Sequence, residues 1–228
     1  MTRTSAALVL PLAWALAACG SSGAPTPPCT EFAGSITITS GAEWRTLVDG
    51  GCTSVSGDLT ISGLANSSLQ GTPAIKTIGG RLSIRNNPGL MLVDLPSLTA
   101  VGGDLDVSAN AKLQSFLLPS LVTVGGWLGV SGNPTMTSLG VPVLLSAGAI
   151  VVDQNDGLAT FGFPSLASTS MERVEINNNG SLVSLAFPAL ISVAGGGSSS
   201  RKSSTPKLHL PGTHYDSGLR GDRQQCIS

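Results

Sequence analysis

Charged and aromatic residues are scarce in this chain of 228 residues. Only 11% of the residues are Asp, Glu, Lys or Arg, only 4% are aromatic, and the formal net charge is −1. Without an excess of basic residues, the chain lacks the electrostatic footprint of a nucleic-acid-binding protein. The exposed faces of helices need charged side chains, so the low charge and the 29 glycines favour short strands and tight turns. We therefore predict a mainly β protein that binds no nucleic acid.

Sequence motifs of common enzyme classes are also absent. The chain has no G-x-S-x-G, H-E-x-x-H or C-x-x-C motif. Its glycine pairs precede candidate strands, whereas the glycine fingerprint of a nucleotide site follows a strand and opens a helix. His209, His214 and Cys226 match no spacing typical of a metal site. We predict no catalytic residue, no metal and no cofactor.

The N-terminal residues have the pattern of an export signal followed by a tether. The apolar run from Ala6 to Ala18 is too short for a permanent membrane span. Leu16-Ala17-Ala18-Cys19 resembles the bacterial lipobox, which implies cleavage before Cys19, lipidation of its thiol, and attachment to the outer membrane or cell surface. The alternative is an ordinary signal peptide that leaves Cys19 unmodified. We expect a signal peptide over residues 1–18 and a lipidated cysteine with a flexible tether over residues 19–28.

A segment of about ten residues recurs along the chain at an almost constant interval. VGGDLDVSAN begins at residue 101 and VGGWLGVSGN at residue 124, and aligned apolar-x-apolar triplets are 22–24 residues apart. Self-similarity at this period predicts a solenoid in which every repeat contributes a strand to a parallel sheet. The triplets expected in these strands are residues 36–38, 59–61, 82–84, 105–107, 128–130, 150–152 and 174–176.

Each repeat carries further recurring residues around its triplet. A glycine pair precedes several triplets, and we expect it to allow the backbone angles of a tight corner. A later apolar-Pro pair, such as Leu95-Pro96, should fill the core from the opposite side. An asparagine lies five residues after the first triplet position, where its amide can satisfy backbone groups at a turn. Stacked copies predict a structural ladder of Asn87, Asn110, Asn133, Asn155 and Asn179.

The pattern L-x-I-x-x-N followed by L-P-x-L resembles leucine-rich repeats, and more closely the receptor L domain of growth-factor receptors and some cell-surface lipoproteins. The start of the domain supports this narrower resemblance, because a cysteine, a strand, a short helix and a second cysteine follow one another. Ser40 and Glu43 have the spacing of a helix capping box, and Gly50-Gly51 would end that helix. The resemblance implies a right-handed solenoid of about seven 23-residue repeats with one parallel sheet face, over residues 29–194.

Three cysteines remain if Cys19 carries a lipid. Cys29 and Cys52 flank the first strand and the segment that follows it, so we expect these two to form a disulfide and Cys226 to be left over. Residues 195–228 depart from the repeat and form either a disordered tail or a partial cap. Within them, Leu208-His209-Leu210 could be a displaced eighth strand, although no asparagine follows at the expected distance.

The outward positions of the sheet are where we expect a ligand to bind. An outward tryptophan near arginines is typical of a binding hot spot, and aromatic faces also stack on sugar rings. We therefore predict a non-catalytic surface lipoprotein that recognises a protein or a glycan. The expected ligand-binding residues are Arg81, Arg85, Asp104, Asp106, Trp127, Asp153, Arg173 and Glu175.

Two alternatives stay open at this point. Asp104 and Asp106 lie two positions apart on one strand, about 6–7 Å along it, so they could serve a carbohydrate-active enzyme. Neither is in an apolar setting that would raise one carboxyl pKa, and exposed acids also simply keep a sheet soluble. The other alternative is a structural envelope protein in which a loop or the tail covers Trp127.

Overall fold

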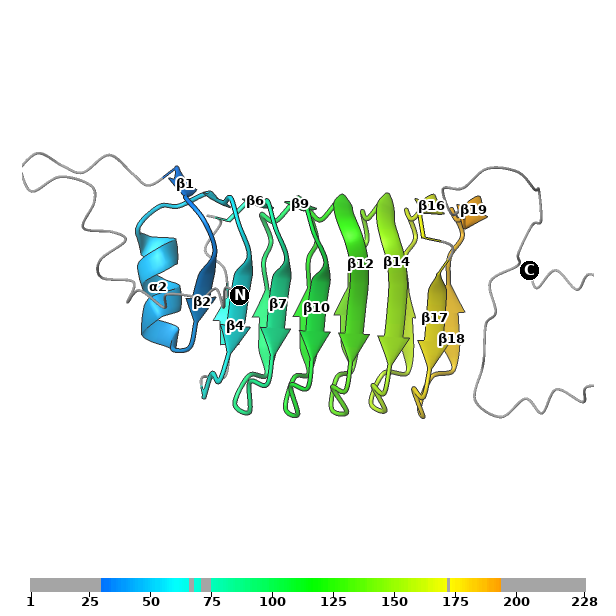
Figure 1. Ribbon diagram of the computed structural model, residues 1–228. Coiled ribbons are helices and arrows are strands. Elements are labelled where there is room, and N and C mark those ends of the chain that lie inside the picture. The colour runs from blue at the N-terminus through cyan, green and yellow to red at the C-terminus, as the bar shows by residue number, and fades with distance from the viewer. Residues whose placement is uncertain (1–29, 66–67, 71–74, 172, 194–228) are drawn as a thin grey trace, which may run out of the picture.

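The computed structural model describes residues 30–65, 68–70, 75–171 and 173–193 as a parallel β-solenoid (Figure 1). The chain coils through about six turns, and the described part is mainly β with little helix. Parallel strands lie on three sides of the coil, which we call the front sheet, the back sheet and the corner strip. The predicted β-solenoid is thus confirmed, whereas the expectation of one parallel sheet face is incomplete.

The front sheet contains every predicted apolar triplet. Equivalent residues pair in register from turn to turn, so that Leu82 pairs with Leu105, and Leu105 with Leu128. Their side chains point inward, and all three are fully buried. In order across the sheet, the strands are β2 (Ile36–Ile38), β4 (Leu59–Ser62), β7 (Leu82–Arg85), β10 (Leu105–Ser108), β12 (Thr123–Ser131), β14 (Ser146–Asp153) and β17 (Val174–Asn177).

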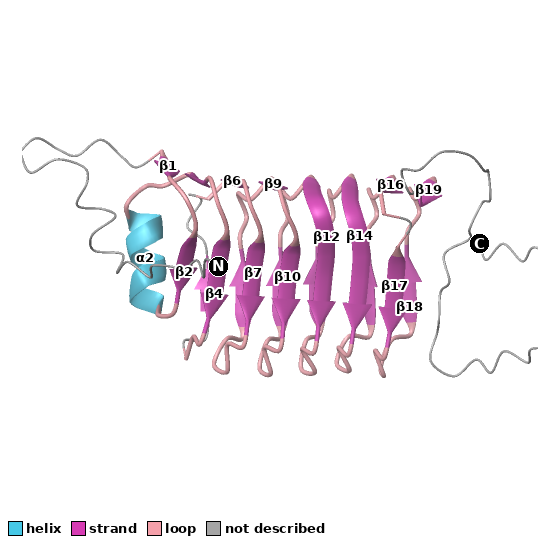
Figure 2. Cartoon of the chain, in the orientation of Figure 1, coloured by secondary structure: helices cyan, strands magenta, loops and turns pink. Residues whose placement is uncertain are grey.

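The other two sides of the coil consist of shorter strands (Figure 2). The back sheet comprises β5 (Ser68–Gln70), β8 (Leu92–Asp94), β11 (Ser115–Leu117) and β13 (Ser138–Gly140), followed by the pair β15 (Thr160–Gly162) and β18 (Ser184–Ala186). The corner strip comprises β1 (Glu31–Phe32), β3 (Ser54–Val55), β6 (Thr77–Ile78), β9 (Ala100–Val101), the first residues of β12 and β14, β16 (Ser168–Thr169) and β19 (Ser192–Val193). Inward side chains from the three sides form one continuous apolar core.

A ladder of asparagines runs through this core at the end of the front strands. The Oδ1 atom of Asn110 accepts hydrogen bonds from the backbone N–H of Asn87 at 3.1 Å and from its Nδ2 at 2.9 Å. The Nδ2 atom of Asn110 donates to the carbonyl of Ile84 at 2.9 Å and to Oδ1 of Asn133 at 3.2 Å. The same arrangement continues along the solenoid, and the asparagines that form it are Asn87, Asn110, Asn133, Asn155 and Asn179.

The residue before each ladder asparagine has a left-handed backbone, and so does Gly63, which precedes the buried Leu64 at the equivalent position of an earlier turn. The φ angles lie between 50° and 74°, a region that is readily adopted by Gly and Asn but strained for most other residues. This turn directs the next side chain into the core. The residues concerned are Gly63, Asn86, Ala109, Gly132, Gln154 and Asn178. Sequence reasoning missed this row, although its mixture of Gly and Asn is the usual signal for such a turn.

The glycine pairs have a different role from the one that we predicted. Gly79, Gly102 and Gly125 are outside the left-handed region, so backbone angle is not the constraint. A Cβ atom added to Gly102 would instead collide with the carbonyl oxygen of Gly79, one turn earlier, and Gly125 has the same relation to Gly102. Glycine is therefore needed because successive turns approach closely at this corner.

A helix closes the N-terminal end of the solenoid. Helix α2 (Gly41–Asp49) lies beyond β2 in Figure 1 and buries Trp44, Leu47 and Val48. The predicted capping box is present, because Glu43 N–H donates to Ser40 Oγ at 3.3 Å and Ser40 N–H donates to Glu43 Oε2 at 3.1 Å. The helix ends at Gly50, as expected.

Several predictions concern residues outside the described part of the chain. These are the signal peptide, the lipidated Cys19, the tether, Cys29 and the tail over residues 195–228. Cys52 is fully buried, but its pairing with Cys29 stays a prediction. Within the described ranges, no helix is long and apolar enough to cross a membrane.

Candidate functional site

The candidate site lies on the front sheet, at the start of the apolar triplets in β7, β10 and β12. The residue just before each apolar triplet belongs to a row across the solenoid, which includes Asp58, Arg81, Asp104 and Trp127. Asp58 Oδ1 in this row accepts a hydrogen bond from the N–H of Arg81 at 2.7 Å, one turn later. Asp104 Oδ1 likewise accepts from the N–H of Trp127 at 3.1 Å. These two carboxylates therefore hold neighbouring turns in register as well as contributing charge.

Asp104 also forms an ion pair with Arg81. The distance between Asp104 Oδ2 and Arg81 Nη2 is 2.6 Å, and the Asp104 side chain is 22% exposed. Burial raises the pKa of the Asp104 carboxyl, but the hydrogen bonds from Trp127 and Arg81 and the positive charge of Arg81 outweigh burial. The net pKa is lower than the usual value, so Asp104 is a carboxylate near neutral pH.

The Asp104 environment predicts a specific loss of stability in acid. A folded-state pKa below the unfolded one stabilises the fold above the unfolded pKa, and this contribution is lost as pH falls through the folded pKa. Asp104→Asn should therefore cost about 1 kcal/mol at pH 7, and the difference from wild type should shrink below about pH 4. Urea unfolding of both proteins between pH 2.5 and 7 measures this difference.

High salt provides the control for the same experiment. In 1 M NaCl the ion pair with Arg81 is screened, whereas the hydrogen bond from the Trp127 backbone persists. The pH-dependent difference should shrink but not vanish. Parallel stability curves for wild type and Asp104→Asn across the whole pH range would show that this carboxylate has no linkage to folding.

The Trp127 ring packs over the backbone of Gly129 on the same strand. A Cβ atom added to Gly129 would collide with the six-membered ring of Trp127, so the indole occupies the space above that glycine. Gly129 pairs in register with Asp106 on β10 and with Val151 on β14, and both neighbours are half-buried. The Trp127 side chain itself is half-buried. The result is an apolar platform on the outer surface, beside the Arg81–Asp104 pair.

The other predicted ligand residues lie apart from this platform. On β14, Asp153 Oδ1 accepts a hydrogen bond from Asn178 Nδ2 at 2.9 Å. Arg173 forms an exposed ion pair with Glu175 on β17 at 2.8 Å, which raises the Arg173 pKa and lowers the Glu175 pKa. Arg85 is exposed at the far end of β7. The predicted residues thus divide into a platform group and three separate polar positions on one sheet: Asp153, the Arg173–Glu175 pair and Arg85.

The two carboxylates of the enzymatic alternative have different surroundings. Asp106 Oδ2 accepts a hydrogen bond from Ser108 Oγ at 3.2 Å, whereas Asp104 is occupied by Arg81 and the Trp127 backbone. A general acid needs a raised pKa, and the Asp104 pKa is shifted in the opposite direction. Among the described residues, no group of three or more His, Cys, Asp or Glu side chains could hold a metal ion.

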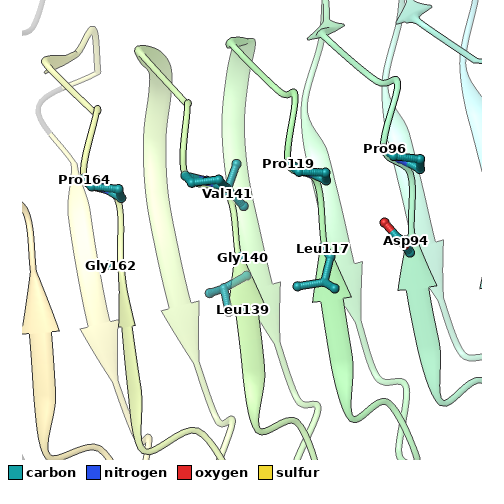
Figure 3. A pocket seen from close by; sticks show the side chains of 10 residues that line it. Asp94, Pro96, Leu117, Pro119, Leu139, Gly140, Val141, Gly162 and Pro164 are labelled. Carbon is teal, nitrogen blue, oxygen red and sulfur yellow. The ribbon is translucent and has the colours of Figure 1, made fainter. Parts of the chain in front are cut away.

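Sequence reasoning missed an apolar groove on the back sheet (Figure 3). Its volume is about 510 Å³, and Gly140 and Gly162 form part of its floor because they replace the larger outward side chains of β8 and β11. The sequence does contain a signal for this groove. The residue two positions before each repeated proline is large in the earlier repeats but is glycine at residues 140 and 162. The lining residues are Asp94, Pro96, Leu117, Pro119, Leu139, Gly140, Val141, Pro142, Gly162 and Pro164.

A second hollow of about 300 Å³ lies over the corner strip. Small residues from β9, β12, β14 and β16 and from the turns that follow them line it, among them Gly102, Thr123, Ser146 and Ser168. The hollow exists in part because Gly102, Gly125 and Gly148 carry no side chains. No charged or aromatic side chain lines it, so it has fewer groups that could bind a ligand than the platform has.

Comparisons of the chain with family models, with curated proteins and with solved structures found no match. Function must therefore be inferred from the residues of this chain.

Proposed function

We propose that this chain is a lipid-anchored protein of a bacterial outer membrane or cell surface that recognises a protein or glycan ligand without catalysing a reaction. The proposed anchor is Cys19, in the sequence that resembles a lipobox. The proposed recognition surface is the front sheet around the platform. A solenoid suits this role because it presents a long, regular surface on a rigid core.

The proposal extends to the class of the domain. We infer a receptor L domain of about seven 23-residue repeats, with a disulfide between Cys29 and Cys52. Support comes from the position of helix α2, which follows the first front strand and has the capping box expected from Ser40 and Glu43. A second point of support is the buried asparagine at the end of successive front strands.

The observation that carries the binding proposal is the contact between Trp127 and Gly129. An indole that already packs over a glycine has less conformational entropy to lose when a ligand packs on it than a freely rotating side chain has. Aromatic platforms of this kind suit the apolar faces of sugar rings and the side chains of protein partners. Arg81, held beside it by Asp104, adds hydrogen-bond donors at the edge of the platform.

We place the enzymatic alternative second. Its proposed acid, Asp104, already makes an ion pair and a backbone hydrogen bond, and its pKa is lowered. The structural alternative conflicts directly with the recognition proposal, because a covered Trp127 could not contact a ligand. A binding experiment separates it from recognition.

The platform should dominate binding to cell envelopes. A soluble form of residues 24–228 is mixed with washed cells and envelope fractions, and the retained fraction is titrated. Trp127→Ala with Arg81→Ala should weaken retention about 10–30-fold, which is the typical effect of removing a hot spot. Gly129→Val should weaken it as well, because the new side chain displaces the indole while Trp127 is still present.

Control variants and treatments distinguish specific recognition from nonspecific adsorption. Val183→Ser changes a highly exposed apolar residue outside the front sheet and should leave retention unchanged. Protease treatment of the envelopes removes a protein ligand, whereas periodate removes a glycan ligand. Equal retention of wild type and both platform variants, or no retention of any form, would favour the structural alternative.

A further inference from the structure

The C-terminal end of the described solenoid lacks the cover that earlier turns provide for one another. Leu185, Phe187 and Leu190 of the last turn are only partly buried. Their equivalents one turn earlier are Phe161, Phe163 and Leu166, which are 8%, 0% and 0% exposed. The difference arises because nothing among the described residues packs on the outer side of β18.

The incomplete burial in the last turn is confined to β18 and the residues that follow it. On the front sheet, Val174 and Ile176 of the last strand are 9% and 2% exposed. These two residues therefore need no further turn to be buried. An occupant of the open end must bring apolar side chains to β18 and has little to add beside β17.

The chain itself contains such a segment after the described residues. The back strands from β8 onward share the pattern apolar-x-apolar-Pro, which starts at Val93, Phe116, Leu139, Phe161 and Leu185 at intervals of 22–24 residues. Leu208-His209-Leu210-Pro211 repeats this pattern 23 residues after Leu185. As an eighth front strand this segment would be displaced, whereas its spacing matches the back sheet without any displacement.

The sequence between β18 and Leu208 lacks the residues that a further front strand would need. The position expected for a front triplet, residues 197–199, reads Gly-Ser-Ser, and Lys202 stands where the next ladder asparagine would be. This stretch cannot continue the apolar core of the front sheet or the asparagine ladder. A partial turn that contributes only a back strand therefore fits both the chain and the open end.

We propose that Leu208–Pro211 adds a parallel strand to the outer edge of β18 and caps the C-terminal end of the solenoid. Leu208 and Leu210 would cover Leu185, Phe187 and Leu190, and His209 would point outward beside Ala186. In earlier turns the N–H of Leu118 donates to the carbonyl of Gly140 at 2.8 Å. The equivalent bond joins the N–H of Phe187 to the carbonyl of His209. This cap is independent of the proposed ligand site.

Disulfide trapping tests the register of this strand. Neighbouring parallel strands lie about 4.8 Å apart, which is within the Cα separation that a disulfide spans. In a full chain with Cys226→Ser, the pair Ala186→Cys with His209→Cys should form an intrachain disulfide under mild oxidation, mapped by peptide mass spectrometry. Its yield should be at least ten times that of Ala186→Cys with Ser204→Cys, because Ser204 would lie more than about 10 Å away.

Two further variants make each outcome decisive. Asp94→Cys with Leu117→Cys joins described back-sheet residues that pair in register and shows that the chemistry works on this fold. A disulfide between two copies of Ala186→Cys would assign the open end to a second molecule and overturn the proposal. Equal yields for the His209 and Ser204 pairs would overturn it as well.

Hydrogen exchange provides a measurement without new cysteines. Leu208→Asp with Leu210→Asp should speed exchange of the β18 amides and of Phe187 at least tenfold, whereas the outward substitution His209→Asp should leave them unchanged. Unchanged exchange in the double variant would show that the segment does not cover β18.

Discussion

Asn110→Ala is expected to lower the free energy of unfolding by about 3–4 kcal/mol, because it leaves several buried polar groups without partners. The N–H and Nδ2 groups of Asn87 lose their acceptor, and the carbonyl of Ile84 loses its side-chain donor. Asn110 is 0% exposed, so water cannot replace these bonds without opening the turn. Urea denaturation followed by circular dichroism measures the loss.

The neighbouring asparagine supplies a matched control. Asn86 is exposed and has a φ of 54°, and Ala109 occupies the equivalent position of the next turn with a φ of 53°. Asn86→Ala should therefore cost no more than about 1 kcal/mol. Equal destabilisation by Asn86→Ala and Asn110→Ala would contradict this prediction. It would mean that asparagine stabilises the fold at these positions through its local backbone preference, and that the hydrogen bonds of the ladder add nothing further.

The ladder and the front strands could be predicted because the physical requirement repeats with the sequence. Each turn needs inward apolar residues and an acceptor for the same bare backbone groups, so identical residue types recur every 22–24 positions. Helix α2 was predictable for a similar reason, since Ser40 and Glu43 are both needed for one local motif.

The candidate site could be predicted only in part, because its geometry depends on contacts between turns. The sequence places Trp127, Asp104 and Arg81 on one face, but it does not reveal that Asp104 binds the backbone of the next turn. The position of the Trp127 ring over Gly129 is also a rotamer choice that no periodicity encodes. The back-sheet groove was missed because it depends on the absence of side chains at Gly140 and Gly162.

The corner glycines show how a residue can be exposed and still intolerant of substitution. Gly102 is exposed, so its accessibility alone predicts that alanine is harmless. Its neighbour in the preceding turn, however, is the carbonyl group of Gly79, which belongs to the backbone and cannot move to another rotamer. A methyl group at residue 102 therefore forces two turns apart.

Gly102→Ala is accordingly expected to cost about 2–3 kcal/mol, in the range of overpacked cores. The separation of the turns should strain the hydrogen bonds Gly102 N–H to Ile78 carbonyl, at 2.8 Å, and Gly126 N–H to Gly103 carbonyl, at 2.9 Å. Urea unfolding measures the loss of stability, and amide exchange at residues 102 and 126 locates it.

Gly132→Ala separates this collision from the conformational cost of replacing glycine. Gly132 has a φ of 62°, but a Cβ atom there would come no closer than 3.7 Å to Ala109. Its cost should be only about 1 kcal/mol, because Ala109 already adopts this backbone conformation one turn earlier. A larger loss for Gly132→Ala than for Gly102→Ala would mean that backbone angle governs these glycines, and that the close approach of successive turns at the corner leaves room for a methyl group.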